Sequence, residues 1–194
     1  MVQSVSLTDE IPHGVAIGVR QEEDHLRDLM VRYQQADQAA VEELVRRLSP
    51  LLLRFFASPE NNRADAEDLL QDCWIRIHRA RHTYRSAEPL LPWIFAIARH
   101  ARLDSRRRQC RRAAREVLVA ETPERMEENS GRGTAVLELL DLLPESQRDV
   151  IVMLKVLGLS LEDVARATSS TVGSVKQKAH RTYVRLKQLL EEQK

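Results

Sequence analysis

The chain has 194 residues, 43% of them hydrophobic, 30% charged and only 4% aromatic, which is typical of a folded, helix-rich protein of one ordinary or two small domains. The net charge of +1 hides two basic segments, residues 99–115 and 174–187, on either side of an acidic one, residues 116–145. No apolar run approaches the roughly 20 residues of a membrane-spanning helix, and residues 1–20 lack the pattern of a secretion signal. We therefore expect a cytoplasmic protein without membrane insertion.

The N-terminal part of the chain predicts a flexible extension followed by two helices. Residues 1–21 carry no apolar periodicity, and we expect them to form the extension. Apolar residues at helical spacing run through residues 22–57, with breaks near Ala36–Asp37 and at Pro50. The pattern leaves open whether the second helix continues past the proline.

Two more helices complete the first half. The segment from Arg63 to about Arg81 predicts a third helix. A loop follows through Pro89, and a fourth helix starts near residues 91–93 and continues through the arginines of residues 99–115. These four helices are enough to bury one small core.

A Glu-rich stretch separates this half from the next. Residues 116–133 lose apolar periodicity and predict a linker, so we place a domain boundary there. Beyond it we expect a helix at residues 134–143, a break at Pro144 and a second helix at residues 145–156 that stops at Gly158.

The last segment predicts a helix-turn-helix. Ser160 followed by Asp163 resembles a capping box, with Asp in place of the usual Glu, and starts a short helix through residue 167. Residues 168–171 form a tight polar turn, in which Thr171 is positioned to cap a second helix that begins around residues 172–174.

The faces of these two helices fit a DNA-binding role. Ala165 is the small residue at the crossing, Val164 and Val175 are the apolar contacts, and Ser169 stands in the turn where glycine is the easiest choice. On the second helix we expect Val175, Ala179 and Leu186 to point inward, with Thr182 or Tyr183 between them. The outward face then carries Lys176, Gln177, His180 and Arg181, which suit phosphate and base-edge contacts in the major groove. The alternative is a merely solvated helix face.

Several stretches of the sequence resemble a known family, the bacterial extracytoplasmic-function (ECF) sigma factors. In the first half these are DAEDLLQDCWIRIHRAR at residues 65–81 and PWIFAIARHARLDSRRR at residues 92–108. In the second half they are LLPESQRDV at residues 142–150 and GLSLEDVA at residues 158–165. The resemblance extends over about residues 22–190, in the family's order and with a linker between the halves.

The resemblance implies an all-α fold of two small helical domains joined by a flexible linker. Domain 2, residues 22–115, is expected to bind core RNA polymerase and to recognise and melt the minus 10 element. Domain 4, residues 134–194, is the helix-turn-helix domain expected to recognise the minus 35 element. The implied partners are core polymerase, through its β′ clamp and β flap, promoter DNA and an anti-sigma factor. The implied function is initiation of transcription at a specific regulon, without catalytic activity, cofactor or metal.

The resemblance also assigns site residues. Asp68, Gln71 and Asp72 lie at i, i+3 and i+4, and so share one helix face. The expected core-polymerase contacts are Asp65, Asp68, Gln71 and Asp72. The expected minus 10 contacts are Tyr84, Trp93, Arg99, His100, Arg102, Asp104, Arg106, Arg107 and Arg108, a mixture of planar and cationic groups that suits single-stranded DNA. The expected minus 35 contacts are Ser174, Lys176, Gln177, Lys178, His180, Arg181 and Arg185.

Other interpretations stay open at this point. The acidic helix face is also compatible with simple solvation, and Trp93, beside Ile94 and Phe95, fits a core position equally well. The acidic linker is either an ordinary tether or a segment that holds the two basic domains together in the absence of polymerase.

Metal binding and disulfide formation are not favoured. His78 and His82 lie at i and i+4, one turn after Cys73, but no third ligand is clearly placed. The only cysteines, Cys73 and Cys110, are far apart in sequence and favour buried, inert, reduced thiols over a disulfide.

Two other classes of protein remain as alternatives. One is an operator-binding regulator, in which the first domain senses a signal and the helix-turn-helix binds duplex DNA without polymerase. The other is an interaction protein that sequesters a partner through its helices.

Overall fold

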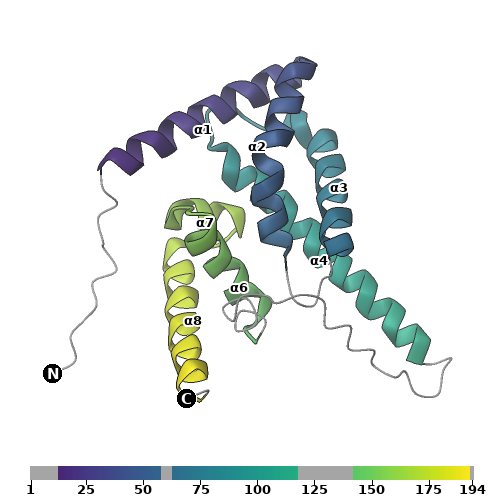
Figure 1. The fold of residues 1–194 in the computed structure, drawn as a ribbon, viewed down its shortest axis with the longest axis vertical. Coiled ribbons are helices and arrows are strands. Elements are labelled where there is room, and N and C mark those ends of the chain that lie inside the picture. The colour runs from purple at the N-terminus through teal and green to yellow at the C-terminus, as the bar shows by residue number, and fades with distance from the viewer. Residues whose placement is uncertain (1–12, 58–62, 118–141, 193–194) are drawn as a thin grey trace.

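The computed structural model describes residues 13–57, 63–117 and 142–192, and the regular elements in these ranges are all helical (Figure 1). The first domain comprises α1 (His13–Gln34), α2 (Gln38–Phe56), α3 (Arg63–Ala80), the 3-10 turn η1 (Arg81–Thr83) and α4 (Leu90–Val117). The second comprises α6 (Glu145–Ile151), the π-helical turn η2 (Val152–Val156), α7 (Leu161–Ala167) and α8 (Val172–Glu192). The all-α prediction is confirmed. The predicted linker from residue 118 onward, and most of the helix predicted at residues 134–143, lie outside the described residues.

A tight turn joins α1 to α2. The N–H of Ala36 donates to the carbonyl of Tyr33 (3.0 Å), and that of Asp37 donates to the carbonyl of Arg32 (3.1 Å), which are the two bonds of a Schellman ending. Asp37 then caps α2, because its carboxylate accepts a hydrogen bond from the N–H of Ala40 (3.2 Å). The helix break predicted near Ala36–Asp37 is confirmed.

Two helix boundaries differ from the apolar pattern. α1 begins at His13, well before residue 22, so the last part of the predicted flexible extension is helical. A helix anchored by packing, here of Leu26 and Met30, gains further turns at little cost per residue. α2 continues through the exposed Pro50, because the buried Leu48 and Leu52 hold the helix in place on both sides of the lost backbone hydrogen bond.

The first domain buries apolar side chains from all four of its helices. Its fully buried members include Met30, Leu44, Leu48, Leu52, Phe55, Phe56, Cys73, Ile77, Ile94 and Phe95. The carboxylate of Glu23 on α1 accepts the N–H of Leu90 at the start of α4, and Pro92 occupies the first turn of α4, where no N–H is needed. α4 crosses α2 and α3, and its C-terminal part projects beyond the bundle at the lower right of Figure 1.

The second domain is built from shorter helices. α6 continues directly into η2. Gly158 follows η2 with φ +69°, which confirms the predicted helix stop at this glycine. α8 packs against both α6 and α7. The fully buried centre of the second domain consists of Val150, Met153, Val164 and Val175.

The two domains are in direct contact. α7 packs against α4, and η2 packs against α2. The buried apolar residues of the two domains form one continuous cluster. Charged side chains of α4 and α6 also pair across this boundary.

Candidate nucleic-acid interface

The first helix of the predicted helix-turn-helix starts at a capping residue. The hydroxyl of Ser160 accepts a hydrogen bond from the N–H of Asp163 (3.1 Å), so the predicted N-cap is confirmed. The second half of the interaction differs from a standard capping box. The Asp163 side chain is one methylene shorter than Glu, and its carboxylate accepts from the Ser160 hydroxyl (2.7 Å).

The turn between α7 and α8 has defined geometry. Ser169 adopts φ +50° and donates its N–H to Arg166 (3.1 Å), while the N–H of Ser170 donates to Ala165 (2.9 Å). These two bonds make a second Schellman ending, with serine where glycine is usual. Thr171 then caps α8 by accepting the N–H of Ser174 (3.1 Å), which confirms the predicted cap and fixes the crossing of the two helices.

α8 has one buried and one exposed face. Val175, Ala179 and Thr182 are buried, and the Thr182 hydroxyl donates to the Lys178 carbonyl (2.8 Å). The sequence left open whether Thr182 or Tyr183 points inward. Thr182 is the buried residue, and Tyr183 is exposed. The predicted outward face is exposed at Lys176, Gln177, His180, Arg181 and Arg185, while Ser174 and Lys178 are half-buried.

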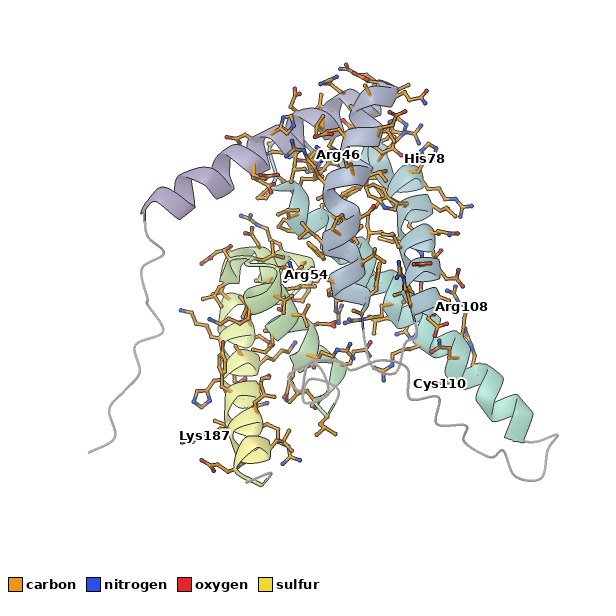
Figure 2. All side chains as sticks on the ribbon, viewed as in Figure 1. Arg46, Arg54, His78, Arg108, Cys110 and Lys187 are labelled. Atoms are coloured by element: carbon orange, nitrogen blue, oxygen red, sulfur yellow. The ribbon has the colours of Figure 1, made fainter. Side chains whose placement is uncertain are left out.

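The projecting part of α4 carries an exposed basic surface. Arg106, Arg107, Arg108 and Arg111 are all exposed there, and Figure 2 shows Arg108 and Cys110 on this segment. Arg107 lies 3.7 Å from Asp104, and Arg108 lies 3.7 Å from Asp72. These are surface pairs of small energetic weight, and Arg106 also lies 3.6 Å from Glu145 of α6.

Arg99 and Arg102 lie elsewhere, in the boundary between the domains. Arg102 is only 5% exposed, and it donates to the Phe55 carbonyl (3.1 Å) while its guanidinium lies 4.3 Å from the centroid of the Phe55 ring. Burial lowers the pKa of Arg102 to about 9, which still leaves it charged at neutral pH. Both arginines pair with the buried Asp149, Arg99 at 3.2 Å. Sequence reasoning missed Asp149, because no local pattern links it to an arginine 50 residues earlier.

Asp104 has an intramolecular role. Its carboxylate accepts from Arg76 of α3 (2.8 Å), and this hydrogen bond lowers the pKa of Asp104. The pair joins α3 to α4 at the point where the exposed arginines begin. The same carboxylate lies 3.7 Å from Arg107, so Asp104 is engaged with arginines of its own domain beside the predicted DNA contacts.

The aromatic residues predicted to meet an unstacked base differ in exposure. Tyr84 is only 5% exposed, its hydroxyl donates to the Glu88 carbonyl (2.7 Å), and burial raises its pKa to about 12. Its ring packs on the half-buried Trp93, with centroids 5.5 Å apart. Tyr84 is therefore a core residue in this conformation, Trp93 is shared between core and surface, and His100 is exposed.

α3 presents the predicted acidic and amide face. Asp68 and Gln71 are exposed, while Asp65 and Asp72 are half-buried. Asp72 accepts from Arg76 of the same helix (3.1 Å), which also donates to Asp104 of α4 (2.8 Å), so Arg76 connects this face to α4. The sequence reasoning missed Ile75, which is 50% exposed one turn after Gln71 and adds an apolar contact point to the face.

His78 takes part in a contact between α3 and α1. Its Nδ1 is hydrogen-bonded to the Tyr33 hydroxyl (2.8 Å), and the described ranges hold no group of three His, Cys, Asp or Glu side chains placed to bind a metal. Cys73 is buried, and burial raises its pKa to about 12, so its thiol stays protonated. Cys110 is exposed, so the expectation that both thiols are buried is wrong for it. Within the same ranges, no helix is both long enough and apolar enough to cross a membrane.

Comparison with known proteins gives matches to both halves of the chain. Residues 44–112 match Sigma-70 region 2, and residues 134–186 match Sigma-70, region 4. The RNA polymerase sigma factor CarQ of Myxococcus xanthus is 32% identical over 169 residues, which cover 84% of this chain and 96% of CarQ. The ECF RNA polymerase sigma factor SigD of Mycobacterium tuberculosis is 31% identical over 166 residues, which cover 78% of this chain and 77% of SigD.

Solved structures with the same fold include CnrH in complex with the cytosolic domain of CnrY. That structure matches with a TM-score of 0.67 and 26% identity, over 88% of this chain and 99% of that chain. The sigma factor RpoE in complex with the anti-sigma factor NepR from Bartonella quintana matches with a TM-score of 0.65 and 23% identity. It covers 78% of this chain and 96% of that chain, and it supports the fold alone.

Proposed function

Because the chain belongs to the ECF RNA polymerase sigma factors, we propose that its two domains read the two elements of one promoter while α3 binds core polymerase. The observation that carries this proposal is the division of exposed nucleic-acid donors between two domains: a helix-turn-helix face on α8 and an arginine tract on α4. A single operator-binding surface needs only the first of these.

For the minus 35 element, the proposed reader is the exposed face of α8. Lys176 and Arg181 supply cationic donors for phosphates, and Gln177 and His180 supply groups that discriminate base edges in the major groove. Ser174, Lys178 and Arg185 lie at the edges of this face, where phosphate contacts are expected. The capped turn at Thr171 supports the assignment, because it holds α8 at a fixed angle to α7.

For the minus 10 element, the proposed reader is α4. Arg106, Arg107 and Arg108 would track the backbone of the separated strand, and His100 and the accessible part of Trp93 would contact bases. Arg99 and Arg102 join this set only after they leave Asp149. The ring of Tyr84 packs against Trp93 and holds it in place, and Asp104 orients the arginines.

The proposed core-polymerase surface is the α3 face. Asp68 and Gln71 are its exposed centre, Asp65 and Asp72 flank it, and Ile75 adds apolar area. Its expected partner is the β′ clamp, and the second domain is expected to contact the β flap. Since polymerase supplies the chemistry of RNA synthesis, we propose that this chain is a non-catalytic subunit that acts in the cytoplasm on promoter DNA.

An inhibitory protein partner is also proposed. CnrH, which shares the fold at 26% identity, is seen with the cytosolic domain of CnrY bound. The exposed apolar side chains of Ile75, Leu142 and Val184 suit an anti-sigma factor that covers α3 and the second domain.

The test is run-off transcription with purified core polymerase on a pool of genomic promoters. Addition of this protein is expected to yield transcripts from a defined subset of templates. Equal transcript yields with and without the protein would overturn the proposal. Tight, sequence-specific binding to duplex DNA without polymerase, together with no transcription, would instead indicate an operator-binding regulator.

A further inference from the structure

Side chains of α4 and α6 meet in five charged residues, which we call the interdomain ion cluster: Arg99, Arg102, Arg106, Glu145 and Asp149. Asp149 is only 1% exposed, and its two carboxylate oxygens meet Arg99 (3.2 Å) and Arg102. Glu145 lies 3.9 Å from Arg102 and 3.6 Å from Arg106. The cluster therefore spans the two domains.

The spacing of these residues places each set on a single side of its helix. The arginines occupy positions i, i+3 and i+7 of α4, and the acids occupy i and i+4 of α6, so each set lies on one side of its helix. Arg148, next to Asp149, donates to the Ala57 carbonyl at the end of α2 (3.0 Å). The contact thus combines opposite charges with a directed hydrogen bond.

Arg102 is held by its own domain, independently of Asp149. One guanidinium nitrogen donates to the Phe55 carbonyl and the guanidinium stacks on the Phe55 ring, both within the first domain. The group that faces Asp149 is therefore oriented before the second domain arrives. Arg102, with Arg99 beside it, therefore forms an anion site on α4 that is occupied here by the Asp149 carboxylate.

Because the ion pair is buried, Asp149 is held at the two arginines with only a small net free energy. A buried ion pair gains Coulomb energy but loses hydration, so its net stabilisation is small even though each charge depends strongly on the other. Another anion that reaches the two arginines can therefore replace Asp149 at modest net cost. A DNA phosphate, like a carboxylate, matches the bidentate geometry of a guanidinium group.

The closed arrangement also conflicts with the span of a promoter. The minus 10 and minus 35 elements lie about 25 base pairs apart, which is about 85 Å at 3.4 Å per base pair. α7 packs against α4, and α8 follows after a short turn and is only about 32 Å long for its 21 residues. The two proposed DNA-binding faces are too close together to engage both elements unless the domains separate.

We propose that Asp149 is an intramolecular competitor for DNA: it occupies the phosphate site of Arg99 and Arg102 in the free protein and leaves it when polymerase separates the domains. The inference rests on the proposed function of α4 in minus 10 binding. The masking itself requires no partner protein, because both sides of the contact belong to this chain. The exposed face of α8 stays accessible in the closed form, so the two promoter contacts are controlled differently.

The first test measures the distance between the domains in the full-length protein. Cys110 on the projecting part of α4 and Lys187→Cys on α8 carry spin labels, and both positions are exposed (Figure 2). Cys73 is buried with its thiol protonated, so it is expected to stay unlabelled. The free wild-type background should give one narrow distance distribution, and core polymerase should shift it to longer distances.

Asp149→Asn removes the charge with little change of shape and should shift the free protein toward longer, broader distances. Glu145→Gln is the matched control: it lies on the same α6 face and also faces Arg102, but it is more exposed and its contacts, to Arg102 and Arg106, are longer. It should change the distribution much less. A broad distribution in the free wild-type background would overturn the proposal, and so would an unchanged one in a folded Asp149→Asn variant. If circular dichroism shows that this variant does not fold, the wild-type measurement still decides.

The second test measures binding of a short single-stranded oligodeoxynucleotide by free protein. If the open form is populated in one molecule in ten or fewer, Asp149→Asn should raise the affinity by about tenfold or more, and Glu145→Gln by far less. An unchanged affinity would overturn the competition. Failure of the competitor role can be distinguished from failure of the proposed function. If the wild type transcribes from specific promoters and Asp149→Asn binds the oligonucleotide no better than the wild type, only the competitor role is removed. Absence of transcription would remove the proposed function, while the distance measurement still reports on the closed form.

Discussion

At the residue scale, three positions with left-handed backbone mark helix ends in the described part of the chain. Ala36, Gly158 and Ser169 have φ of +65°, +69° and +50°. An L side chain in this conformation costs about 1–2 kcal/mol, which only the glycine avoids. Ser169 nonetheless makes both bonds of its Schellman ending, so the turn of the helix-turn-helix is held by hydrogen bonds against local strain.

Ser169→Gly is therefore expected to stabilise the protein. Relief of the backbone strain should exceed the entropy that glycine adds to the unfolded chain, for a net gain of about 0.5–1 kcal/mol. Urea titration checks this as a rise in the unfolding midpoint with an unchanged slope. The matched change is Gly158→Ala, whose new Cβ would meet no atom within 4 Å, so its expected loss of about 1 kcal/mol is purely conformational. A loss of stability in Ser169→Gly would contradict the strain argument.

Specificity is also expected at the level of single residues of α8. If His180 reads a base edge, His180→Ala should relax promoter preference at one base pair of the minus 35 element, by about 1–3 kcal/mol of discrimination. Lys176→Ala should instead weaken binding almost equally at all sequences, because a phosphate contact carries no sequence information. Transcription from a library of minus 35 variants measures both effects. Unchanged promoter choice in His180→Ala would count against this base-reading face.

At the element scale, α3 combines two roles on two faces. Its buried face contributes Leu69, Cys73 and Ile77 to the core, and its exposed face carries Asp68 and Gln71. A charge reversal on the exposed face should therefore change binding without changing the fold.

Asp68→Arg is expected to lower the affinity for core polymerase by about 10- to 100-fold, or about 1.4–2.8 kcal/mol. The thermal unfolding midpoint should stay close to that of the wild type, because Asp68 is exposed. Glu67→Arg is the control, because it is also a reversal of charge, on the neighbouring exposed residue, which lies about 100° away around the helix. Fluorescence anisotropy of labelled protein titrated with core enzyme measures the affinities. Equal losses in both variants would show a non-specific charge effect instead of the assigned contact.

The elements themselves were predictable to the extent that their signals are local. The cap at Thr171, the break at Asp37 and the stop at Gly158 each depend on a few neighbouring residues, and all three are confirmed. α1 extends to His13 and α2 crosses Pro50 because packing, which periodicity does not measure, outweighs weak local signals.

Side-chain partners across the domain boundary were not predictable in this way. The sequence marks Arg99 and Arg102 as part of one basic segment, and nothing local distinguishes them from Arg107, which is exposed. The difference arises because Asp149, 50 residues away from Arg99, folds against only part of that segment. Tyr84 is a similar case, since its burial depends on the position of Trp93 in the folded domain.

At the scale of the whole molecule, the charge pattern of the sequence acquires a structural meaning. Glu145 belongs to the acidic segment, Asp149 follows it, and both meet arginines of the first basic segment. Carboxylates of α6 thus link the two domains, which is a different contact from the one considered for the acidic linker. The linker itself lies outside the described residues.

This arrangement predicts different salt dependences for the free protein and the polymerase complex. Each phosphate contact to single-stranded DNA contributes about 0.7 to the slope of log affinity against log salt concentration. In the polymerase complex, where the domains are apart, Arg99→Gln should reduce the slope by about 0.7, and Asp149→Asn should leave it unchanged. In the free protein, Asp149→Asn should steepen the slope for an oligodeoxynucleotide by up to about 1.4, because two arginines become available.

The control for these slopes is Arg46→Gln, an exposed arginine on α2 that pairs with Glu43 and lies far from Arg108 in Figure 2. It should alter neither slope, since it belongs to neither proposed DNA-binding face. A steeper slope for Asp149→Asn in the polymerase complex would mean that Asp149 still contacts the arginines there, and so would contradict separation of the domains. A slope that stays the same in free Asp149→Asn would mean that its removal exposes no phosphate site, and the closed form would then have no role in masking DNA contacts.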